Sequence, residues 1–175
     1  ISTLHQASLE IMTKTGLRFF EEEALSLFKK AGVRISDGNL VFIEPKLVEW
    51  ALDCAPKNIT IYDRDGQTSM ELGSGRCYYG VGSDCAYLYD IKSGLRRRAV
   101  KQDVIDGVHL VDALEHVDFA MSMVLPEDVA IGKHEPFQMA TMLTETTKPI
   151  VYVGENIQSS RCAVEMATSV AGSEK

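Results

Sequence analysis

The sequence has 175 residues and a formal net charge of −7. This length corresponds to about one domain, which is large enough to bury a hydrophobic core. The acidic charge argues against a nucleic-acid or anionic-membrane surface, because either would favour a basic face. No stretch reaches the roughly 18 apolar residues of a membrane-spanning helix, and the first residues lack the form of a secretory signal. We therefore expect a cytoplasmic protein.

The distribution of potential metal ligands predicts no metal site. The four cysteines are scattered and form no C-x-x-C pair, which argues against a zinc ribbon and a thioredoxin-like motif. His134 and Glu135 begin like the H-E-x-x-H motif, but Gln138 occupies the position of the second histidine. We expect ordinary reduced thiols and no bound metal.

Residues 1–75 have the pattern of a helix-and-hairpin cap. Helices are predicted over 2–15, with Gly16 as a left-handed stop, over 21–31, and over 46–54 after Pro45. Two hairpins are predicted, at 33–35 with 40–43 and at 59–62 with 68–72. Each contains an Asp-Gly pair, which supplies the positive φ that tight turns need.

From residue 76 onward strands and helices alternate, so 76–175 is predicted to be a second domain. Strands are expected at 76–81, 117–125 and 149–153, a hairpin at 86–90 with 95–100, and helices at 102–114, 134–146 and 159–170. The second and third strands are nearly continuous apolar runs, typical of a parallel sheet covered by helices. Such βα units belong either to a doubly wound sheet or to a (β/α)₈ barrel. Because a barrel needs eight strands, the barrel alternative predicts a truncated chain.

Polar groups follow each predicted parallel strand, where functional side chains gather in both architectures. These clusters are Gly82–Asp84, Pro126–Asp128 and Gly154–Asn156. Turns and helix caps explain each cluster taken alone. Together with nearby tyrosines, however, the acidic groups would suit a cation, because ring faces attract quaternary ammonium and a carboxylate supplies the counter-charge. The predicted substrate-binding residues are Tyr79, Gly82, Ser83, Asp84, Tyr152 and Glu155.

Two other motifs in this region receive simpler interpretations. The segment from Gly80 to Cys85 begins like the dinucleotide motif G-x-G-x-x-G, but cysteine replaces the third glycine and no helix follows. We predict instead that Gly80 and Gly82 leave room for the close approach of another group. In the run 96–98 of three arginines, Arg97 is expected to point away from its neighbours on a strand.

Five segments resemble the N-terminal part of the trimethylamine:corrinoid methyltransferase family, which includes glycine betaine methyltransferases. The segments are HQASLEIMTKTGLRF (5–19), EEALSLFKKAGV (22–33), APKNITIYDRDG (55–66), YYGVGSDCAYLYDIKSGLRRRA (78–99) and TETTKPIVY (144–152). The similarity runs in order along the chain and covers well under half of a typical member. It implies an N-terminal cap followed by the first three βα units of a (β/α)₈ barrel.

The same resemblance implies transfer of a methyl group from a methylated amine to the Co(I) of a separate corrinoid protein. No cofactor is then bound directly, and the pyrrolysine of the trimethylamine branch would lie beyond this chain. Catalytic residues are not assigned, and a homo-oligomer is compatible with the family. Two alternatives remain open: a non-catalytic module that binds a quaternary amine or a protein partner, and a doubly wound domain with a phosphorylated ligand.

Overall fold

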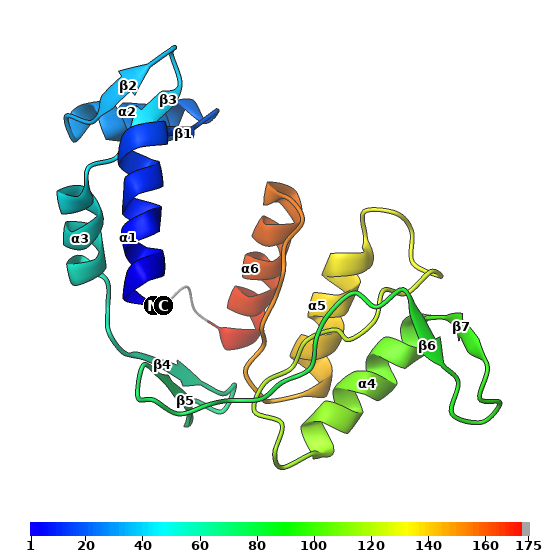
Figure 1. The fold of residues 1–175 in the computed structure, drawn as a ribbon. Helices are drawn as coiled ribbons and strands as arrows, with labels where there is room; N and C mark the ends of the chain where they lie inside the picture. The colour runs from blue at the N-terminus through cyan, green and yellow to red at the C-terminus, as the bar shows by residue number, and fades with distance from the viewer. Residues whose placement is uncertain (173–175) are drawn as a thin grey trace. The chain divides into compact units, whose positions relative to one another are not determined.

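The computed structural model describes residues 1–172 as a set of helices and small sheets (Figure 1). Contacts between Cα atoms divide the chain into two units, 1–57 and 58–175. The predicted boundary at residue 75 stays a prediction, and the last three residues of the range 76–175 lie outside the described part. None of the helices within residues 1–172 combines the length and apolar character that a membrane span requires.

The first unit contains the predicted helices and hairpin. Helix α1 (Ser2–Glu10) continues as the π-helix η1 (Ile11–Thr15), followed by α2 (Glu22–Lys30) and α3 (Pro45–Cys54). Strands β2 (Arg34–Ser36) and β3 (Leu40–Phe42) form the expected antiparallel hairpin. A short strand that the sequence pattern did not predict, β1 (Leu17–Arg18), pairs with the other edge of β3. Val41 on β3 is fully buried in this unit.

Gly16 ends the first helix in a different conformation from the predicted left-handed stop. Its dihedral angles are φ 78° and ψ 170°, a region that essentially only glycine occupies. A Cβ atom at this position would lie 3.0 Å from the Val41 carbonyl oxygen. The chain therefore needs glycine here for both conformation and space, because β1 must start directly against β3.

The second unit contains two antiparallel hairpins and three helices. Strands β4 (Ile59–Tyr62) and β5 (Thr68–Leu72) form the first hairpin, and β6 (Tyr87–Tyr89) and β7 (Arg96–Arg98) form the second. The helices are α4 (Lys101–Ala113), α5 (His134–Glu145) and α6 (Ile157–Ala171). The two hairpins and the three helices begin and end within two residues of the predicted positions.

The three predicted parallel strands do not form regular strands in residues 1–172. Only isolated parallel bridges join these segments, Gly80 with Phe119 and Ala120 with Ile150. A further parallel bridge joins Val124 to Cys85, which lies beyond the first predicted strand. The order and the parallel direction are as predicted, but the ladders are interrupted. Asp84 and Met123 have positive φ angles of 62° and 61°, which break the extended backbone that a continuous ladder requires.

Helices α4, α5 and α6 lie side by side in sequence order, α4 against α5 and α5 against α6 (Figure 1). Their apolar faces form the main core with the parallel segments. Its fully buried members include Val108, Val111, Ala120 and Met142. Each segment-helix pair thus packs on the preceding one, which is the arrangement that alternating strands and helices predict.

Arg97 joins the β6–β7 hairpin to the start of α4. Its guanidinium donates to both carboxylate oxygens of Asp103 at 2.6 and 2.7 Å and to Asp90 at 3.2 Å. Arg96 and Arg98 instead lie over the Tyr87 ring, 3.9 and 5.1 Å from its centroid. The prediction that Arg97 diverges from its neighbours is confirmed.

This network predicts a loss of stability in acid. Hydrogen bonds from Ser93 lower the pKa of Asp90 to about 2, and Arg97 adds to the effect. Arg97 also lowers the pKa of Asp103. Because both pKa values are lower in the folded chain than the usual value of about 3.9, their contribution is complete above that value and is lost as the pH falls towards about 2.

In urea unfolding at successive pH values, the Asp103→Asn variant is expected to differ most from the wild type near neutral pH. The difference in free energy of unfolding should shrink as the pH falls below about 4, because protonation then removes the same interaction from the wild type. Asp106→Asn, on the exposed face of the same helix, is the matched control. A pH-independent difference for Asp103→Asn would contradict the assignment.

Candidate functional site

The ends of the parallel segments enclose a small cavity in the second unit. The loop after the first segment supplies two polar residues, the second and third segments supply their C-terminal ends, and α5 supplies the floor. The cavity has a volume of about 10 Å³, close to the space for a single water molecule. Its lining residues are Ser83, Asp84, Ser122, Gln138, Met142, Val151, Tyr152 and Val153.

Asp84 occupies an exposed and well-anchored position in the first of these loops. The backbone on either side is held by the second segment, through Met123 N–H to the Gly82 carbonyl at 3.0 Å and Cys85 N–H to the Met123 carbonyl at 3.1 Å. Its φ of 62° is in the left-handed region, which aspartate tolerates better than most residues. The backbone therefore fixes the direction in which the Asp84 side chain projects from the loop.

Tyr152 contributes a half-buried phenol from the third segment. Burial raises the pKa of Tyr152, and the nearby charge of Glu135 raises it further, while the Ser159 side chain opposes the shift. The hydroxyl also donates to the Ser159 carbonyl oxygen at 3.5 Å. The hydroxyl is therefore protonated at neutral pH. It is a neutral donor that sits beside carboxylates instead of adding another negative charge.

The structure brings Ser83, Asp84 and Tyr152 together at the cavity, but it places the other three predicted residues elsewhere. Tyr79 is 68% exposed, and both its N–H and its carbonyl bond to Asp118 at the start of the parallel segments. Gly82 is exposed and faces open space. Glu155 is also exposed and uses its backbone N–H to donate to Glu135.

Three further polar residues of this region were not predicted as site residues from the sequence. Ser122 and Gln138 line the cavity and are 5% and 4% exposed, and Glu135 is 6% exposed. Glu135 accepts the Glu155 N–H at 2.8 Å and so ties the loop after the third segment to α5. The available signal was the spacing of Glu135, Gln138 and Met142, which places the two polar side chains on the apolar face of the predicted helix.

The remaining polar clusters have structural roles. Asp128 accepts the Lys101 N–H at the start of α4, and Glu127 forms an ion pair with Arg98. Asn156 caps α6 by accepting the Ser159 N–H at 3.0 Å. Within the described part of the chain, no group of three or more His, Cys, Asp or Glu side chains could hold a metal ion.

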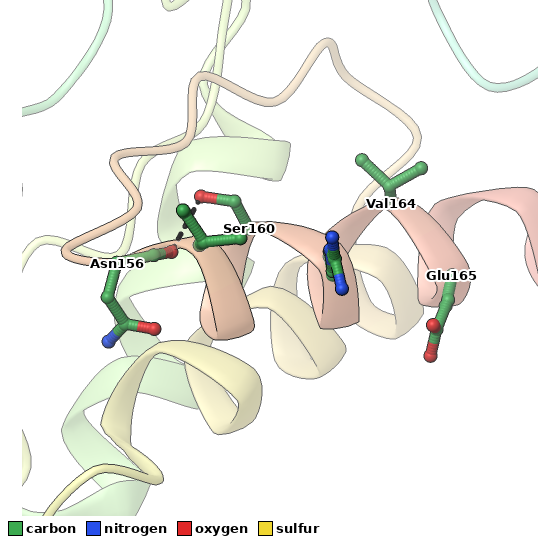
Figure 2. A pocket seen from close by; sticks show the side chains of 6 residues that line it. Asn156, Ser160, Val164 and Glu165 are labelled. Carbon is green, nitrogen blue, oxygen red and sulfur yellow. Dashed lines mark hydrogen bonds between the residues drawn. The ribbon is translucent and has the colours of Figure 1, made fainter. Parts of the chain in front are cut away.

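A second, open pocket lies along the first turns of α6, where Asn156, Ser160, Val164 and Glu165 line it (Figure 2). The Ser160 hydroxyl is already used, donating to the Asn156 carbonyl at 3.0 Å. Val164 is 65% exposed. This pocket is an open surface hollow that Ile157 and Arg161 also line, and none of the predicted substrate-binding residues lies in it.

Comparison with known proteins identifies a family. A family model described as trimethylamine methyltransferase (MTTB) matches residues 1–175. Trimethylamine methyltransferase MttB from Desulfitobacterium hafniense is 25% identical, over 98% of this chain and 35% of its own length. A glycine betaine methyltransferase from the same species is 22% identical, over 98% of this chain and 36% of its own length.

A proline betaine:corrinoid methyltransferase from Eubacterium limosum is 32% identical, over 85% of this chain and 31% of its own length. The chain thus spans about a third of the length of these relatives. The model match extends from the first residue to the last, across both structural units. The predicted resemblance is confirmed, and the chain belongs to the trimethylamine methyltransferase family.

Proposed function

We propose that this chain is the N-terminal part of a corrinoid-dependent methyltransferase. The enzyme moves a methyl group from a methylated amine, such as glycine betaine or trimethylamine, to the Co(I) corrinoid of a partner protein. The observation that carries the proposal is the family match over the whole chain. The names of the relatives add support, because they include a trimethylamine, a glycine betaine and a proline betaine:corrinoid methyltransferase.

The proposal includes a (β/α)₈ barrel, of which this chain supplies the first three units. Three segments that run parallel and in order, each followed by a helix that packs on the previous helix, support this architecture. The covered share of the relatives, about a third, agrees with a cap plus three of eight units. The remaining units would come from the rest of the protein and would pair with the outer edges of the first and third segments.

In this arrangement the residues that line the cavity at the segment ends form one wall of the substrate site. A volume of about 10 Å³ cannot hold a trimethylammonium group, so the later units must supply the other walls. The Asp84 carboxylate would attract the cationic nitrogen, and the neutral Tyr152 would offer a ring and a hydroxyl without adding charge. The corrinoid supplies the cobalt nucleophile, and this chain's residues bind and orient the amine.

The direct test is methyl transfer by the full-length protein. Purified enzyme is mixed with cob(I)alamin and, in separate reactions, with glycine betaine, proline betaine and trimethylamine, and formation of methylcobalamin is followed by its absorbance. Transfer from at least one donor is expected. Absence of transfer across this panel, in a folded protein, would contradict the proposal. Binding without transfer would instead favour a non-catalytic module.

Asp84→Asn in the full-length enzyme is expected to raise the KM for a quaternary amine about tenfold, because one charge-assisted contact is lost. The kcat is expected to change less, since the lost attraction acts on the bound cation in both ground and transition states. Asp65→Asn, in the β4–β5 turn, is the control for the loss of one surface charge. Unchanged kinetics for Asp84→Asn would remove Asp84 from the site.

A further inference from the structure

We infer that Gln138 is a positioning residue for Asp84, and that it orients this carboxylate towards a cationic ligand without neutralising it. The inference rests on the proposed function and names the group that prepares its substrate site. It starts from a buried polar side chain on α5. Gln138 is 4% exposed and lies among apolar neighbours such as Met139 and Met142.

One amide group of Gln138 holds two segments together. Its Nε2 donates to the Val124 carbonyl oxygen at 2.9 Å and to Asp84 Oδ1 at 3.3 Å. Val124 also forms the parallel bridge with Cys85, the residue that follows Asp84. The amide therefore bonds to one member of this bridge and to the residue beside the other member. A glutamine amide has two N–H donors, so this geometry uses both.

The neutrality of the amide distinguishes this contact from the ion pairs of the unit. Arg97 holds Asp90 and Asp103 with a full positive charge, and Arg98 pairs with Glu127. For Asp84, the ion pairs found in residues 1–172 include no Lys, Arg or His partner. A cation at this position would cancel the carboxylate charge, whereas an amide orients it and leaves the charge available.

The backbone and side chain of Asp84 are thus fixed by separate contacts. The hydrogen bonds to Met123 and the positive φ set the backbone of the loop. The Gln138 amide holds one carboxylate oxygen, so the other oxygen remains for a ligand. Pre-oriented charge lowers the cost of ordering a side chain on binding. Gln138 should therefore improve cation binding only when residue 84 is an aspartate.

A double-mutant cycle in the full-length enzyme tests this dependence. The four proteins are the wild type, Gln138→Met, Asp84→Asn and the double variant. Two quantities are measured: the KM and kcat for a quaternary amine, and the Kd of tetramethylammonium by calorimetry. Gln138→Met is expected to raise KM and Kd three- to tenfold in the Asp84 protein, with a smaller change in kcat. In the Asp84→Asn protein the same substitution should cause no further rise.

The matched control is Gln102→Met on α4. Gln102 Nε2 donates to Asp106 Oδ1 at 2.8 Å, which is the same pair of groups on an exposed surface. This variant should keep the wild-type KM and Kd. If Gln138→Met does not fold, Gln138→Asn keeps a buried amide but is too short to reach both acceptors, and it should raise KM and Kd in the same direction.

The outcomes separate this inference from the proposed function. Equal increases in KM in both backgrounds, or a loss of stability with unchanged KM and Kd, would overturn the positioning role while methyl transfer by the wild type stands. A wild type that neither transfers methyl groups nor binds tetramethylammonium would overturn the proposed function, and the inference would fall with it.

Discussion

Replacing Gly80 with alanine is expected to lower the free energy of unfolding by about 2 kcal/mol, because the added methyl group overpacks a close contact. A Cβ atom on Gly80 would overlap the Phe119 ring, with Cε2, Cδ2 and Cζ as its nearest atoms. Gly80 and Phe119 also form the first parallel bridge of the unit. The Phe119 ring must therefore move away, and it then no longer covers the backbone bridge between Gly80 and Phe119. Urea unfolding followed by far-UV circular dichroism measures the effect.

Gly82→Ala is the matched control for this substitution. Gly82 lies two residues further along the same segment, and nothing lies within 4 Å of the position that its Cβ would take. Its φ is also outside the positive range. The variant is expected to change the free energy of unfolding by less than about 0.5 kcal/mol, or to stabilise the chain slightly by restricting the unfolded state. Equal losses for both variants would contradict the assigned role of the Phe119 ring.

The sequence predicts room for a close approach at both glycines. The structure confirms this at Gly80, whereas Gly82 faces open space. Glycine alone signals freedom from a side chain and does not identify the group that uses the space. The approaching ring comes from Phe119, 39 positions later in the chain, and only the parallel pairing brings it there.

Local signals predicted most helices and hairpins correctly. The Asp-Gly turns at 37–38 and 65–66 each join an antiparallel pair, since glycine supplies the positive φ at Gly38 and Gly66. The parallel segments were harder to predict because their irregularity depends on tertiary contacts. Nothing in the sequence around Met123 indicates a positive φ, and this residue type rarely adopts one. A continuous apolar run predicts burial and does not reveal such a break.

In the candidate site, too, some residues are predictable from local signals and others depend on tertiary contacts. Ser83, Asp84 and Tyr152 were found because polar groups gather at the ends of parallel strands, a rule that depends only on order along the chain. Gln138 was missed because it lies in the middle of α5, inside an apolar face. Its partners, Asp84 and the Val124 carbonyl, are more than ten residues away in the sequence. A buried polar side chain must find partners, but its sequence position does not name them.

The side chain of Lys148 also acts through distant partners, and its loss should destabilise the second unit. The ammonium donates to the carbonyl oxygens of Val111, Leu114 and Val117 at 2.7, 2.6 and 2.7 Å. The Val111 and Leu114 carbonyls lie at the end of α4, where the last carbonyls of a helix lack their usual partners four residues later. The Val117 carbonyl lies at the start of the second parallel segment. The negative end of the helix dipole also favours a cation there. Lysine has three donors, and this site uses all of them.

Lys148→Met keeps a long apolar stem but removes the charge and all three hydrogen bonds. We expect the free energy of unfolding to fall by about 3 kcal/mol, since charge-assisted bonds are strong and water can reach only part of the vacated site. Lys133→Met, at an exposed position before α5, is the control and should change stability by less than about 0.5 kcal/mol. Equal stability of the two variants would mean that water replaces the ammonium at little cost. A loss confined to Lys148→Met would show that this one side chain joins the end of α4 to the start of the third parallel segment.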